Sequence, residues 1–430
     1  MAVAGAPRTG PERASAFDAD VIVAGGGPAG AVAARALAQA GVTTLLVDRA
    51  AFPRNKPCGG GLSTRAWRRF PWLEAATAGI DVHRISKLHL EGPHETVLDV
   101  DDPEACIALI RRVEFDAALV DRARAAGARI ESNFEITQVE TSPDGVVLRS
   151  REGRQLSARL VVAADGVHSV IGKRLGVNTR WPRASLALDM MEETPTDTLR
   201  ASRPDVLWVA YAHNGLDGYA YVFPKVRHVN VGIGCVLQHF DEAVTDAPYA
   251  LQQQFVSSLV SRGVLDGRSD RRCFTPFLIP VGGPLPRTTH GRVLFAGDAG
   301  GFVHAITAEG IYYAMVSGEL AGQAIATCGV TADPRRIGDA YERAWRAEIG
   351  PELKDAVRVQ KYLFSNHERV ARVVGGASGS STLTRLLLDF FKGHVSYNTL
   401  RRRMILKFPM TIVRLARTPV STSAMPAAGR

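Results

Sequence analysis

The feature that most constrains this chain is a glycine-rich turn that joins an apolar strand to a helix near its start. An apolar run leads directly into GGGPAG (residues 25–30), a helical pattern follows, and the next apolar run ends in Asp48. In a βαβ unit of this kind, Gly25 permits the tight turn, Gly27 admits a pyrophosphate to the backbone, and Gly30 lets the helix pack on the strand. The helix N-terminus offers unpaired N–H groups to phosphates, and Asp48 is placed to accept hydrogen bonds from a ribose. The pattern predicts a Rossmann-like domain that binds a dinucleotide.

Two further strand ends decide which dinucleotide is bound. The stretch LVVAADGVHS places Asp165-Gly166 after an apolar strand, and GRVLFAGDAGG places Gly297-Asp298 after another. Asp298 is suited to accept a hydrogen bond from a ribityl hydroxyl, and a helix beginning near Glu309–Gly310 would direct its N–H groups and dipole at a flavin pyrimidine edge. A nicotinamide dinucleotide has no ribityl chain. Asp-Gly alone is a common turn dipeptide, but three such motifs in this order predict FAD.

Composition sets the broad class of the protein. The chain has 430 residues, 46% hydrophobic and 22% charged, which suits two domains around a shared cofactor. No apolar run reaches the roughly 18–20 residues that a membrane-spanning helix needs. Residues 1–17 have no apolar signal region and are predicted to form a disordered tail. The five scattered cysteines form neither a disulfide framework nor a CxxC pair, so we expect a cytoplasmic protein without a metal site.

The middle of the chain has the alternation of a β-meander. Residues 205–236 alternate apolar and polar side chains, with turns at 214–218 and near 225–228. A sheet of this kind must bury one face against another part of the protein. We therefore expect that face to line a pocket over the flavin.

The ordered trio of motifs resembles the p-hydroxybenzoate-hydroxylase-like superfamily of FAD proteins. The resemblance implies an α/β fold in which an inserted antiparallel β-sheet substrate domain interrupts the FAD-binding domain and a helical region follows. It also implies that Arg112, which precedes a helix, contacts the flavin. The expected parts are an FAD-binding domain at 18–85, 105–180 and 285–330, a substrate domain at 86–104 and 181–284, and a helical region at 331–430.

Within this superfamily, the chain from residue 18 to about 415 resembles the geranylgeranyl reductase family. The matching stretches are FPRNKPCGGGLS (52–63), GYAYVFPK (218–225), GDAGGFVHAITAEGIYYAMVSGELAG (297–322) and KGHVSY (392–397). The resemblance implies that the loop around Cys58 lies beside the isoalloxazine and that the aromatic strand forms a prenyl pocket.

The chain also departs from this family. Tyr221 stands where the family commonly carries Trp, and HAITAEG (304–310) stands where Asn-Pro-Leu-Thr-Gly-Glu-Gly is common. Because this loop lacks the proline and one glycine of the family pattern, the identity of the substrate stays open.

The expected chemistry is reduction of carbon–carbon double bonds in a polyprenyl, geranylgeranyl-type lipid. Reduced flavin passes a hydride from N5 to one alkene carbon, and the protein supplies orientation, a dry pocket and a proton to the other carbon. The predicted catalytic residues, which donate that proton or hold a water that does, are Cys58, Tyr219 and Tyr221. The predicted cofactor-binding residues are Gly25, Gly27, Pro28, Ala29, Gly30, Asp48, Arg49, Gly59, Gly60, Arg112, Asp165, Gly166, Gly297, Asp298, Glu309, Gly310 and Ile311.

Other functions stay open at this point. One is an FAD-dependent monooxygenase, hydroxylase or halogenase on the same fold. Another is a prenyl-lipid isomerase or carrier that keeps FAD only as structure. An electron carrier to quinone would be expected to hold a cysteine-rich cluster segment, which the sequence lacks. Because there is no second dinucleotide fingerprint, we expect NAD(P)H or a ferredoxin-type protein to donate electrons transiently.

The net charge of +9 is partly explained by a basic, apolar C-terminal segment. Its bases are Arg385, Lys392, Arg401, Arg402, Arg403, Lys407, Arg414 and Arg417. A basic amphipathic helix is typical of a membrane-surface element, and a packed helical face is the alternative. Nothing interleaves aromatic and basic residues as single-strand binders do, so no nucleic acid is expected. We expect a cytoplasmic protein that is peripheral at the inner face of the membrane.

Overall fold

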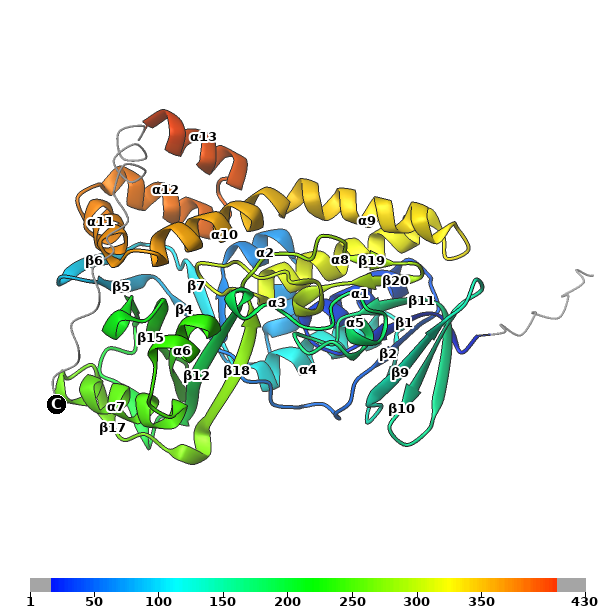
Figure 1. The fold of residues 1–430 in the computed structure, drawn as a ribbon, viewed down its shortest axis with the longest axis horizontal. Coiled ribbons are helices and arrows are strands. Elements are labelled where there is room, and N and C mark those ends of the chain that lie inside the picture. Colours follow the sequence, from blue (N-terminus) through cyan, green and yellow to red (C-terminus); the bar gives the residue numbers. More distant parts are fainter. Residues whose placement is uncertain (1–16, 408–430) are drawn as a thin grey trace, which may run out of the picture.

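Residues 17–407, which the computed structural model describes, form two large β-sheets side by side with C-terminal helices across both (Figure 1). The sheet at the right of Figure 1 contains the first strands of the chain and is called the N-terminal sheet below. The sheet at the left contains the middle of the chain and is called the second sheet.

The N-terminal sheet has the strand order β19-β20-β11-β1-β2-β8, with β10 and β9 attached to β11. The strands from β20 to β8 run parallel. Their apolar sequences are buried, as expected for parallel strands covered on both faces. The strands are β1 (Ala19–Ala24), β2 (Thr44–Val47), β8 (Arg129–Glu131), β9 (Ile136–Thr141), β10 (Val146–Ser150), β11 (Gln155–Ala163), β19 (Thr289–His290) and β20 (Val293–Phe295).

Several helices share one core with the N-terminal sheet. Among them are α1 (Pro28–Gln39), α4 (Arg112–Ala125), α8 (Ile311–Cys328) and α9 (Pro334–Glu348). Small residues bring α1 and α8 together, since a Cβ on Gly318 would lie 2.1 Å from the Ala29 carbonyl oxygen. Tyr341 and Trp345 of α9 are buried in this core. The helices that follow residue 331 therefore begin as part of the packing around the N-terminal sheet.

The second sheet has the strand order β18-β12-β16-β15-β14-β5-β6. Its strand pairs are antiparallel, as predicted for the inserted sheet, except for β14 and β5, which pair in parallel. One face packs on α6 (Leu237–Ala243) and α7 (Pro248–Ser261), and the other faces the pocket described below. The strands are β5 (Lys87–Gly92), β6 (Thr96–Asp101), β12 (Leu186–Pro195), β14 (Val206–Tyr211), β15 (Gly218–Pro224), β16 (His228–Val236) and β18 (Phe274–Pro280).

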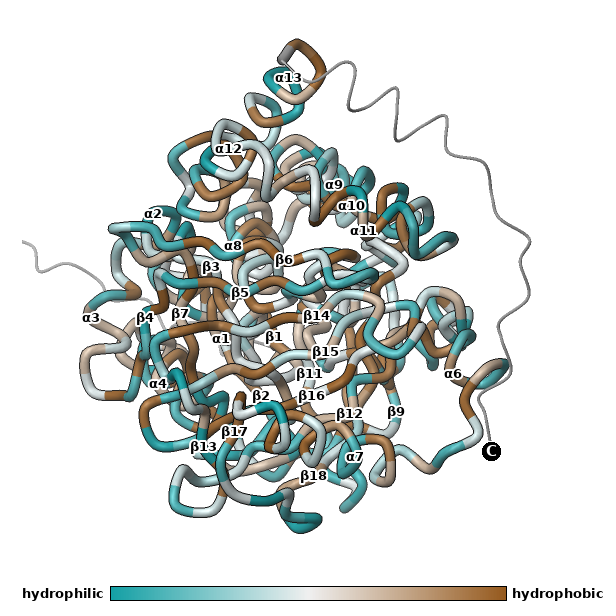
Figure 2. The backbone as a smooth tube through the Cα atoms, turned by 90° about the vertical axis from the view of Figure 1, so that its left-hand side faces the viewer, coloured by the Kyte–Doolittle hydropathy of each residue, from teal (hydrophilic) through white to brown (hydrophobic). Residues whose placement is uncertain are grey.

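Smaller elements complete the fold. A three-stranded sheet orders β3 (Gly61–Ser63), β7 (Ile107–Ile110) and β4 (Val82–Ile85), and a two-stranded sheet pairs β13 (Leu199–Ala201) with β17 (Leu265–Gly267). The remaining helices are α2 (Arg65–Arg69), α3 (Leu73–Thr77), α5 (Val170–Arg174), α10 (Gly350–Phe364), α11 (His367–Ser378), α12 (Ser381–Phe391) and α13 (Tyr397–Lys407). Hydrophobic segments gather in the central strands, and α13 projects at the edge of the molecule (Figure 2).

Two predictions from the sequence fall wholly or partly outside these elements. The predicted N-terminal tail lies outside the described residues except for Phe17, and Arg414 and Arg417 also lie outside them. Within residues 17–407, none of the helices is long and apolar enough to cross a bilayer.

Candidate functional site

Four predicted cofactor-binding positions stand at one edge of the N-terminal sheet. Gly25, Asp48, Asp165 and Gly297 follow the carboxyl ends of β1, β2, β11 and β20, which are adjacent parallel strands. Ligands of open α/β sheets bind outside the carboxyl ends of the strands. The strand order thus brings together motifs that are far apart in the sequence.

The turn between β1 and α1 leaves open space at Gly27. Gly25 has a φ of +100°, and a Cβ there would lie 2.3 Å from the Ala164 carbonyl oxygen. A Cβ on Gly30 would lie 1.8 Å from the Gly25 carbonyl oxygen, so the turn itself requires both glycines. At Gly27 the nearest atoms to a Cβ are guanidinium nitrogens of Arg54 and Arg112, each 3.9 Å away. This space, at the positive end of α1, suits a pyrophosphate.

The next two residues of the motif are helical. Pro28 is the first residue of α1, where a missing N–H costs nothing. Ala29 packs against α8 and against Gly297, whose Cβ would lie 2.9 Å from that of Ala29. The glycine turn and the Gly-Asp motif therefore pack directly against each other.

Asp48 is buried at the end of β2 and holds the turn in place. Its Oδ2 accepts a hydrogen bond from the Gly26 N–H at 2.7 Å and lies 3.3 Å from Nη2 of Arg54. Its Oδ1 accepts from the Ala50 N–H at 2.9 Å. A carboxylate oxygen can accept more than one hydrogen bond, so the role of Asp48 as ribose acceptor stays a prediction that these contacts allow. Arg49 is exposed beside it.

Arg112 is a fixed positive charge beside the turn. It is the first residue of α4, is buried, and donates from Nε and Nη2 to the two oxygens of Asp116 at 2.7 and 2.8 Å. Burial opposes this charge, but Asp116 and the Cys58 sulfur outweigh burial and raise the pKa of the guanidinium. Arg54 pairs with the same carboxylate at 3.2 Å.

Asp165 closes the neighbouring strand β11. Its Oδ2 accepts from the Ile171 N–H at 3.2 Å at the start of α5, whereas Oδ1 is buried and has no hydrogen-bond partner among the described residues. Burial raises the pKa of this carboxyl. Gly166 follows with a φ of +82° and completes the turn. A ligand hydroxyl or N–H would satisfy the unpaired oxygen.

Asp298 lies in a short turn, η4 (Gly297–Gly300), near the start of α8. Its side chain is 21% exposed, with Oδ2 3.9 Å from Nζ of Lys56. A Cβ on Gly310, the N-cap of α8, would lie 3.5 Å from its Oδ1. Ile311 is the first residue of α8. A polar strand end and the positive end of a helix thus meet here.

The carboxylate of Glu309 contacts neighbouring residues of the protein instead of pointing into open space. Its Oε1 accepts from the N–H and hydroxyl of Ser63 at 2.9 and 2.8 Å, and its Oε2 lies 3.8 Å from Arg65. Arg65 is buried and also pairs with Glu352 at 3.0 Å and with the Tyr313 hydroxyl at 2.6 Å. Glu309 therefore anchors the loop before α8, and a cofactor contact from its side chain stays a prediction.

His304 fixes the loop that departs from the family pattern. Its Nδ1 lies 3.0 Å from Oγ1 of Thr307 and accepts from the Thr307 N–H at 3.3 Å, while its ring stacks on Tyr313. Burial and the nearby charge of Arg65 lower the pKa of His304 to about 3, so the ring is neutral. Ala308, in the place of a family glycine, has a φ of +51°. The loop thus adopts a left-handed backbone without the glycine.

The loop from Cys58 to Gly60 packs against β15. The Cys58 sulfur accepts from the Gly60 N–H at 3.4 Å, and its carbonyl oxygen accepts from Asn230 at 3.3 Å. A Cβ on Gly59 would lie 3.1 Å from the Phe223 ring and 3.4 Å from the Tyr221 hydroxyl oxygen. Gly60 has a φ of +76° and approaches the Ile110 carbonyl. This loop connects the phosphate side of the site to the second sheet.

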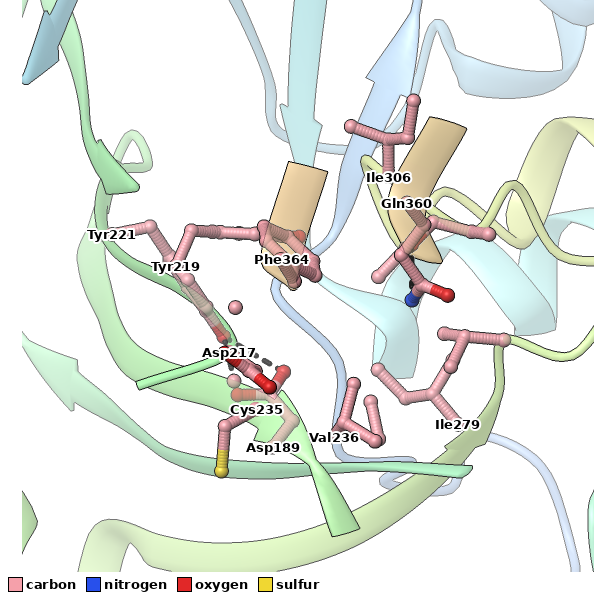
Figure 3. Close-up of a pocket in the computed structure, with 16 residues that line it drawn as sticks. Asp189, Asp217, Tyr219, Tyr221, Cys235, Val236, Ile279, Ile306, Gln360 and Phe364 are labelled. Carbon is pink, nitrogen blue, oxygen red and sulfur yellow. Dashed lines mark hydrogen bonds between the residues drawn. The ribbon is translucent and has the colours of Figure 1, made fainter. Parts of the chain in front are cut away.

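A pocket lies between the second sheet, the 304–310 loop and α10 (Figure 3). Tyr219 and Tyr221 form part of its wall, and the Tyr219 hydroxyl donates to the Thr307 carbonyl at 2.7 Å. The Tyr221 hydroxyl donates to Asp189 at 3.1 Å. Its other lining residues are mostly apolar, among them Val236, Ile279, Val281, Ala305, Ile306 and Phe364.

These positions fit FAD. The open space at Gly27 lies between guanidinium groups, and the unpaired oxygen of Asp165 needs a donor. Asp298 stands where α8 begins, and the Cys58 loop closes the side toward the pocket. Gly27 and Arg112 would hold the pyrophosphate, Asp48 the ribose, and Asp298 the ribityl chain.

Comparison with known proteins identifies the family. A model described as an FAD binding domain matches residues 18–350. Digeranylgeranylglycerophospholipid reductase 1 of Methanothermobacter thermautotrophicus is 30% identical over 368 residues, covering 81% of this chain and 87% of that protein. The chain belongs to the geranylgeranyl reductase family. It is therefore an FAD-dependent oxidoreductase of the geranylgeranyl reductase type.

Other members and a solved structure agree with this assignment. The chloroplastic geranylgeranyl diphosphate reductase of Oryza sativa subsp. japonica is 29% identical over 374 residues, 82% of this chain and 77% of that protein. The crystal structure of a geranylgeranyl bacteriochlorophyll reductase-like protein from Thermoplasma acidophilum superposes with a TM-score of 0.76 at 21% identity. It covers 93% of this chain and 98% of that one, which confirms the predicted α/β flavoprotein fold.

Three residues of the site were not predicted from the sequence. Arg54 and Lys56 lie in the FPRNKPCGGGLS stretch, and two basic residues before a glycine loop were the available signal. Asp189 was visible as a lone acid within the apolar run LALDMM, but its position over the pocket depends on pairing between distant strands. Lys56 and Asp189 face the region between the Gly-Asp motif and the pocket.

Proposed function

We propose that this protein reduces carbon–carbon double bonds of a polyprenyl lipid with a geranylgeranyl-type chain. The observation that carries the proposal is the mostly apolar, aromatic-walled pocket that adjoins the cofactor positions. Ala308, in the loop that leads to α8, lines the pocket, and the Tyr221 hydroxyl lies against the Cys58 loop. A prenyl chain in this pocket would lie beside a flavin held by Asp298 and Gly27.

The chain's own residues orient the substrate and exclude water. When bound, reduced FAD supplies the hydride that an alkene cannot obtain from protein side chains. Phe364, Ile279 and Val281 surround the prenyl chain with apolar surface. The alternate residues of β15 present Tyr219 and Tyr221 to it. Cys58, beside Arg112, is held in the loop that packs against β15 by hydrogen bonds with Asn230 and Gly60.

A transiently bound electron donor is needed to reduce the flavin again after each turnover. The sequence has one dinucleotide fingerprint, at residues 25–30, and the open space at Gly27 supports the use of that turn for FAD. NAD(P)H or a ferredoxin-type protein would therefore reduce the flavin without a tightly held binding domain of its own.

Anaerobic reoxidation of the flavin tests this function. Purified protein is reduced with dithionite in the absence of oxygen, and geranylgeranyl diphosphate or a geranylgeranylated phospholipid is added. We expect the absorbance of oxidised flavin to return as substrate is consumed, in proportion to the double bonds reduced. Reoxidation that requires oxygen would identify a monooxygenase or halogenase, and a flavin that stays reduced while the lipid rearranges would identify an isomerase.

We further propose that α13 lies on an anionic membrane surface, close to the lipid substrate. Ile405 and Leu406 are 54% and 78% exposed, and Arg402 and Arg403 are exposed beside them. Leu400, on the opposite side of the helix, is buried against α12. Exposed apolar and basic residues on one short helix are the composition of an interfacial anchor.

Two other bases of the C-terminal segment have structural roles. Lys392 is buried and pairs with Asp102 at 2.6 Å and with Glu104 at 3.6 Å, so this base fits the alternative of a packed helical face. Arg401 lies 3.5 Å from Asp355 of α10 and attaches α13 to the protein. A test of membrane binding must therefore leave Lys392 and Arg401 unchanged.

A further inference from the structure

Asp189 is a buried acid that faces the substrate pocket. It lies on β12 and is 5% exposed, and alternation along the strand places it on the pocket side with Ala187. The Tyr221 hydroxyl is its hydrogen-bond partner, at 3.1 Å from Oδ2 and 3.4 Å from Oδ1 (Figure 3). The opposite residues in the register, Gly234 and Phe277, offer it no charge.

The groups around Asp189 come from three neighbouring elements. They are Lys56 of the 52–63 loop, Tyr219 and Tyr221 of β15, and Cys235 of β16, and Cys58 of the same loop acts on the two tyrosines. Burial raises the pKa of Asp189 to about 7, with Tyr221 and Lys56 opposing the rise. The pocket's other acid, Asp217, is engaged with His239 at 3.3 Å and His367 at 3.5 Å.

The two tyrosines are poor acids in the same surroundings. Burial raises the pKa of both Tyr219 and Tyr221 well above the usual value, and the charge of Asp189 adds to the effect. An isolated alkene is a weak base, so its protonation needs a general acid held close to it. A general acid works best when its pKa lies near the working pH. Of these three side chains, Asp189 alone meets that condition.

The Tyr221 hydroxyl lies where it can connect Asp189 to the flavin side of the pocket. It contacts Asp189 on one side and approaches the backbone of Gly59 on the other. Gly232, opposite on β16, makes room for it, because a Cβ there would lie 2.5 Å from the hydroxyl oxygen. This arrangement depends on tyrosine at the position where the family commonly carries Trp.

We propose that Asp189 is the proton source for alkene reduction and that the Tyr221 hydroxyl relays the proton, a role that rests on the proposed function. When Asp189 is protonated, it donates to the Tyr221 oxygen, the reverse of the hydrogen bond seen in the structure, and the Tyr221 O–H is free to point at the alkene. The Tyr221 O–H bond breaks as its proton joins one alkene carbon, and in the same step the Asp189 O–H bond breaks as its proton replaces it, so no tyrosinate forms and Asp189 is the acid consumed. The other alkene carbon takes the hydride, with its electron pair, that reduced FAD would supply when bound. The product gains two hydrogens, and Asp189 is left as a carboxylate that regains a proton from solvent.

The test uses a matched pair of buried acids on one strand. Asp189→Asn removes the proposed donor. Glu192→Gln is the control: Glu192 is also buried on β12 with its pKa raised to about 7, but it faces the α7 side and contacts Ser269. Infrared spectra of flavin-free protein follow the carbonyl stretch of protonated carboxyl groups between pH 5 and 9. Single-turnover rates of the reduced holoenzyme, FAD content and substrate affinity are measured in parallel.

We expect Asp189→Asn to lose a protonated-carboxyl band that titrates near pH 7 and to slow reduction by about 10²–10⁴-fold, with FAD content and substrate affinity unchanged. The wild-type rate should fall above pH 7, and the residual rate of Asp189→Asn should lack this fall. Tyr221→Phe should shift the Asp189 band, and the double variant should be no slower than the slower single variant. Glu192→Gln should lose its own band and keep the wild-type rate.

The proposal is overturned if Asp189→Asn keeps the wild-type rate and pH dependence. It is equally overturned if the spectrum shows Asp189 ionised throughout this range. If Asp189→Asn does not fold, Tyr221→Phe tests the proposal instead. A shifted Asp189 carboxyl band together with a slower reduction supports the relay, and an unchanged band and rate overturn it. A wild type that reduces no prenyl substrate removes the proposed function, and with it this role, even when Asp189 titrates as expected.

Discussion

Replacing Gly27 with alanine tests the pyrophosphate site without disturbing the fold. A Cβ at Gly27 would have nothing closer than two guanidinium nitrogens at 3.9 Å, and the backbone φ of −75° suits alanine. The new methyl group would therefore occupy the space in which we propose that the pyrophosphate binds. Gly30→Ala is different, because its Cβ would lie 1.8 Å from a carbonyl oxygen and force the turn apart.

The size of the effect follows from the hydrogen bonds at stake. Charge-assisted hydrogen bonds between backbone N–H groups and a phosphate contribute about 1.5–3 kcal/mol each. Loss of one such bond weakens FAD binding by roughly 10- to 150-fold. The unfolding free energy of the apoprotein should change by less than about 1 kcal/mol, the usual cost of alanine in place of glycine at a helix N-cap.

Titration of apoprotein with FAD, followed by flavin fluorescence, measures the affinity, and urea unfolding measures the stability. Gly79→Ala is the control, since Gly79 is exposed and a Cβ there meets nothing within 4 Å. We expect Gly27→Ala to lose affinity, Gly79→Ala to change neither quantity, and Gly30→Ala to lose stability. Wild-type affinity in Gly27→Ala would refute the assignment of this space to the pyrophosphate.

Three further predictions concern other parts of the chain. Ala308→Gly should raise the unfolding free energy by about 0.5–1 kcal/mol, because it relieves a left-handed alanine; a loss of stability in urea would contradict this reading. Burial raises the pKa of Asp189 from 3.8 to about 7, so its contribution to stability is fully present below pH 4 and is lost as pH rises to 7. Asp189→Asn should therefore be more stable than wild type at pH 8, by at most about 4 kcal/mol, and not at pH 3.5; equal differences at both pH values would disprove the shift. Arg402→Glu/Arg403→Glu should weaken binding to phosphatidylglycerol vesicles roughly 30-fold or more, whereas Arg335→Glu/Arg336→Glu, exposed on α9, should not; equal sedimentation of both variants would remove α13 as the anchor.

The cofactor half of the protein was largely predictable from sequence because its chemistry is local. Gly25, Gly27 and Gly30 act within one turn, and strand ends such as Asp165 and Asp298 are recognisable one at a time. Parallel strands then bring those ends to one edge, so a motif order in the chain becomes an arrangement in space.

The substrate half was less predictable because its contacts join distant segments. Asp189 contacts Tyr221 only because β12 pairs with β16 and β16 pairs with β15. The hydrogen bond from Ser63 to Glu309 joins residues that are 246 positions apart in the sequence. In the sequence, Lys392 is one more base of the basic C-terminal segment. In the structure, its ammonium group forms an ion pair with Asp102, the residue that follows β6. No local pattern distinguishes a base that is paired at long range from one that is free to meet a membrane.

The mass of the product from one anaerobic turnover tests the central claim most directly. Reduced holoenzyme is mixed, in the absence of oxygen, with geranylgeranyl diphosphate or a geranylgeranylated phospholipid. The molecular mass of the extracted lipid is then measured by mass spectrometry. We predict a product heavier by two hydrogen atoms for each double bond reduced, and no such product from protein whose flavin is left oxidised. A lipid of unchanged mass with a displaced double bond, or one that gains oxygen or halogen only when air is admitted, would contradict it.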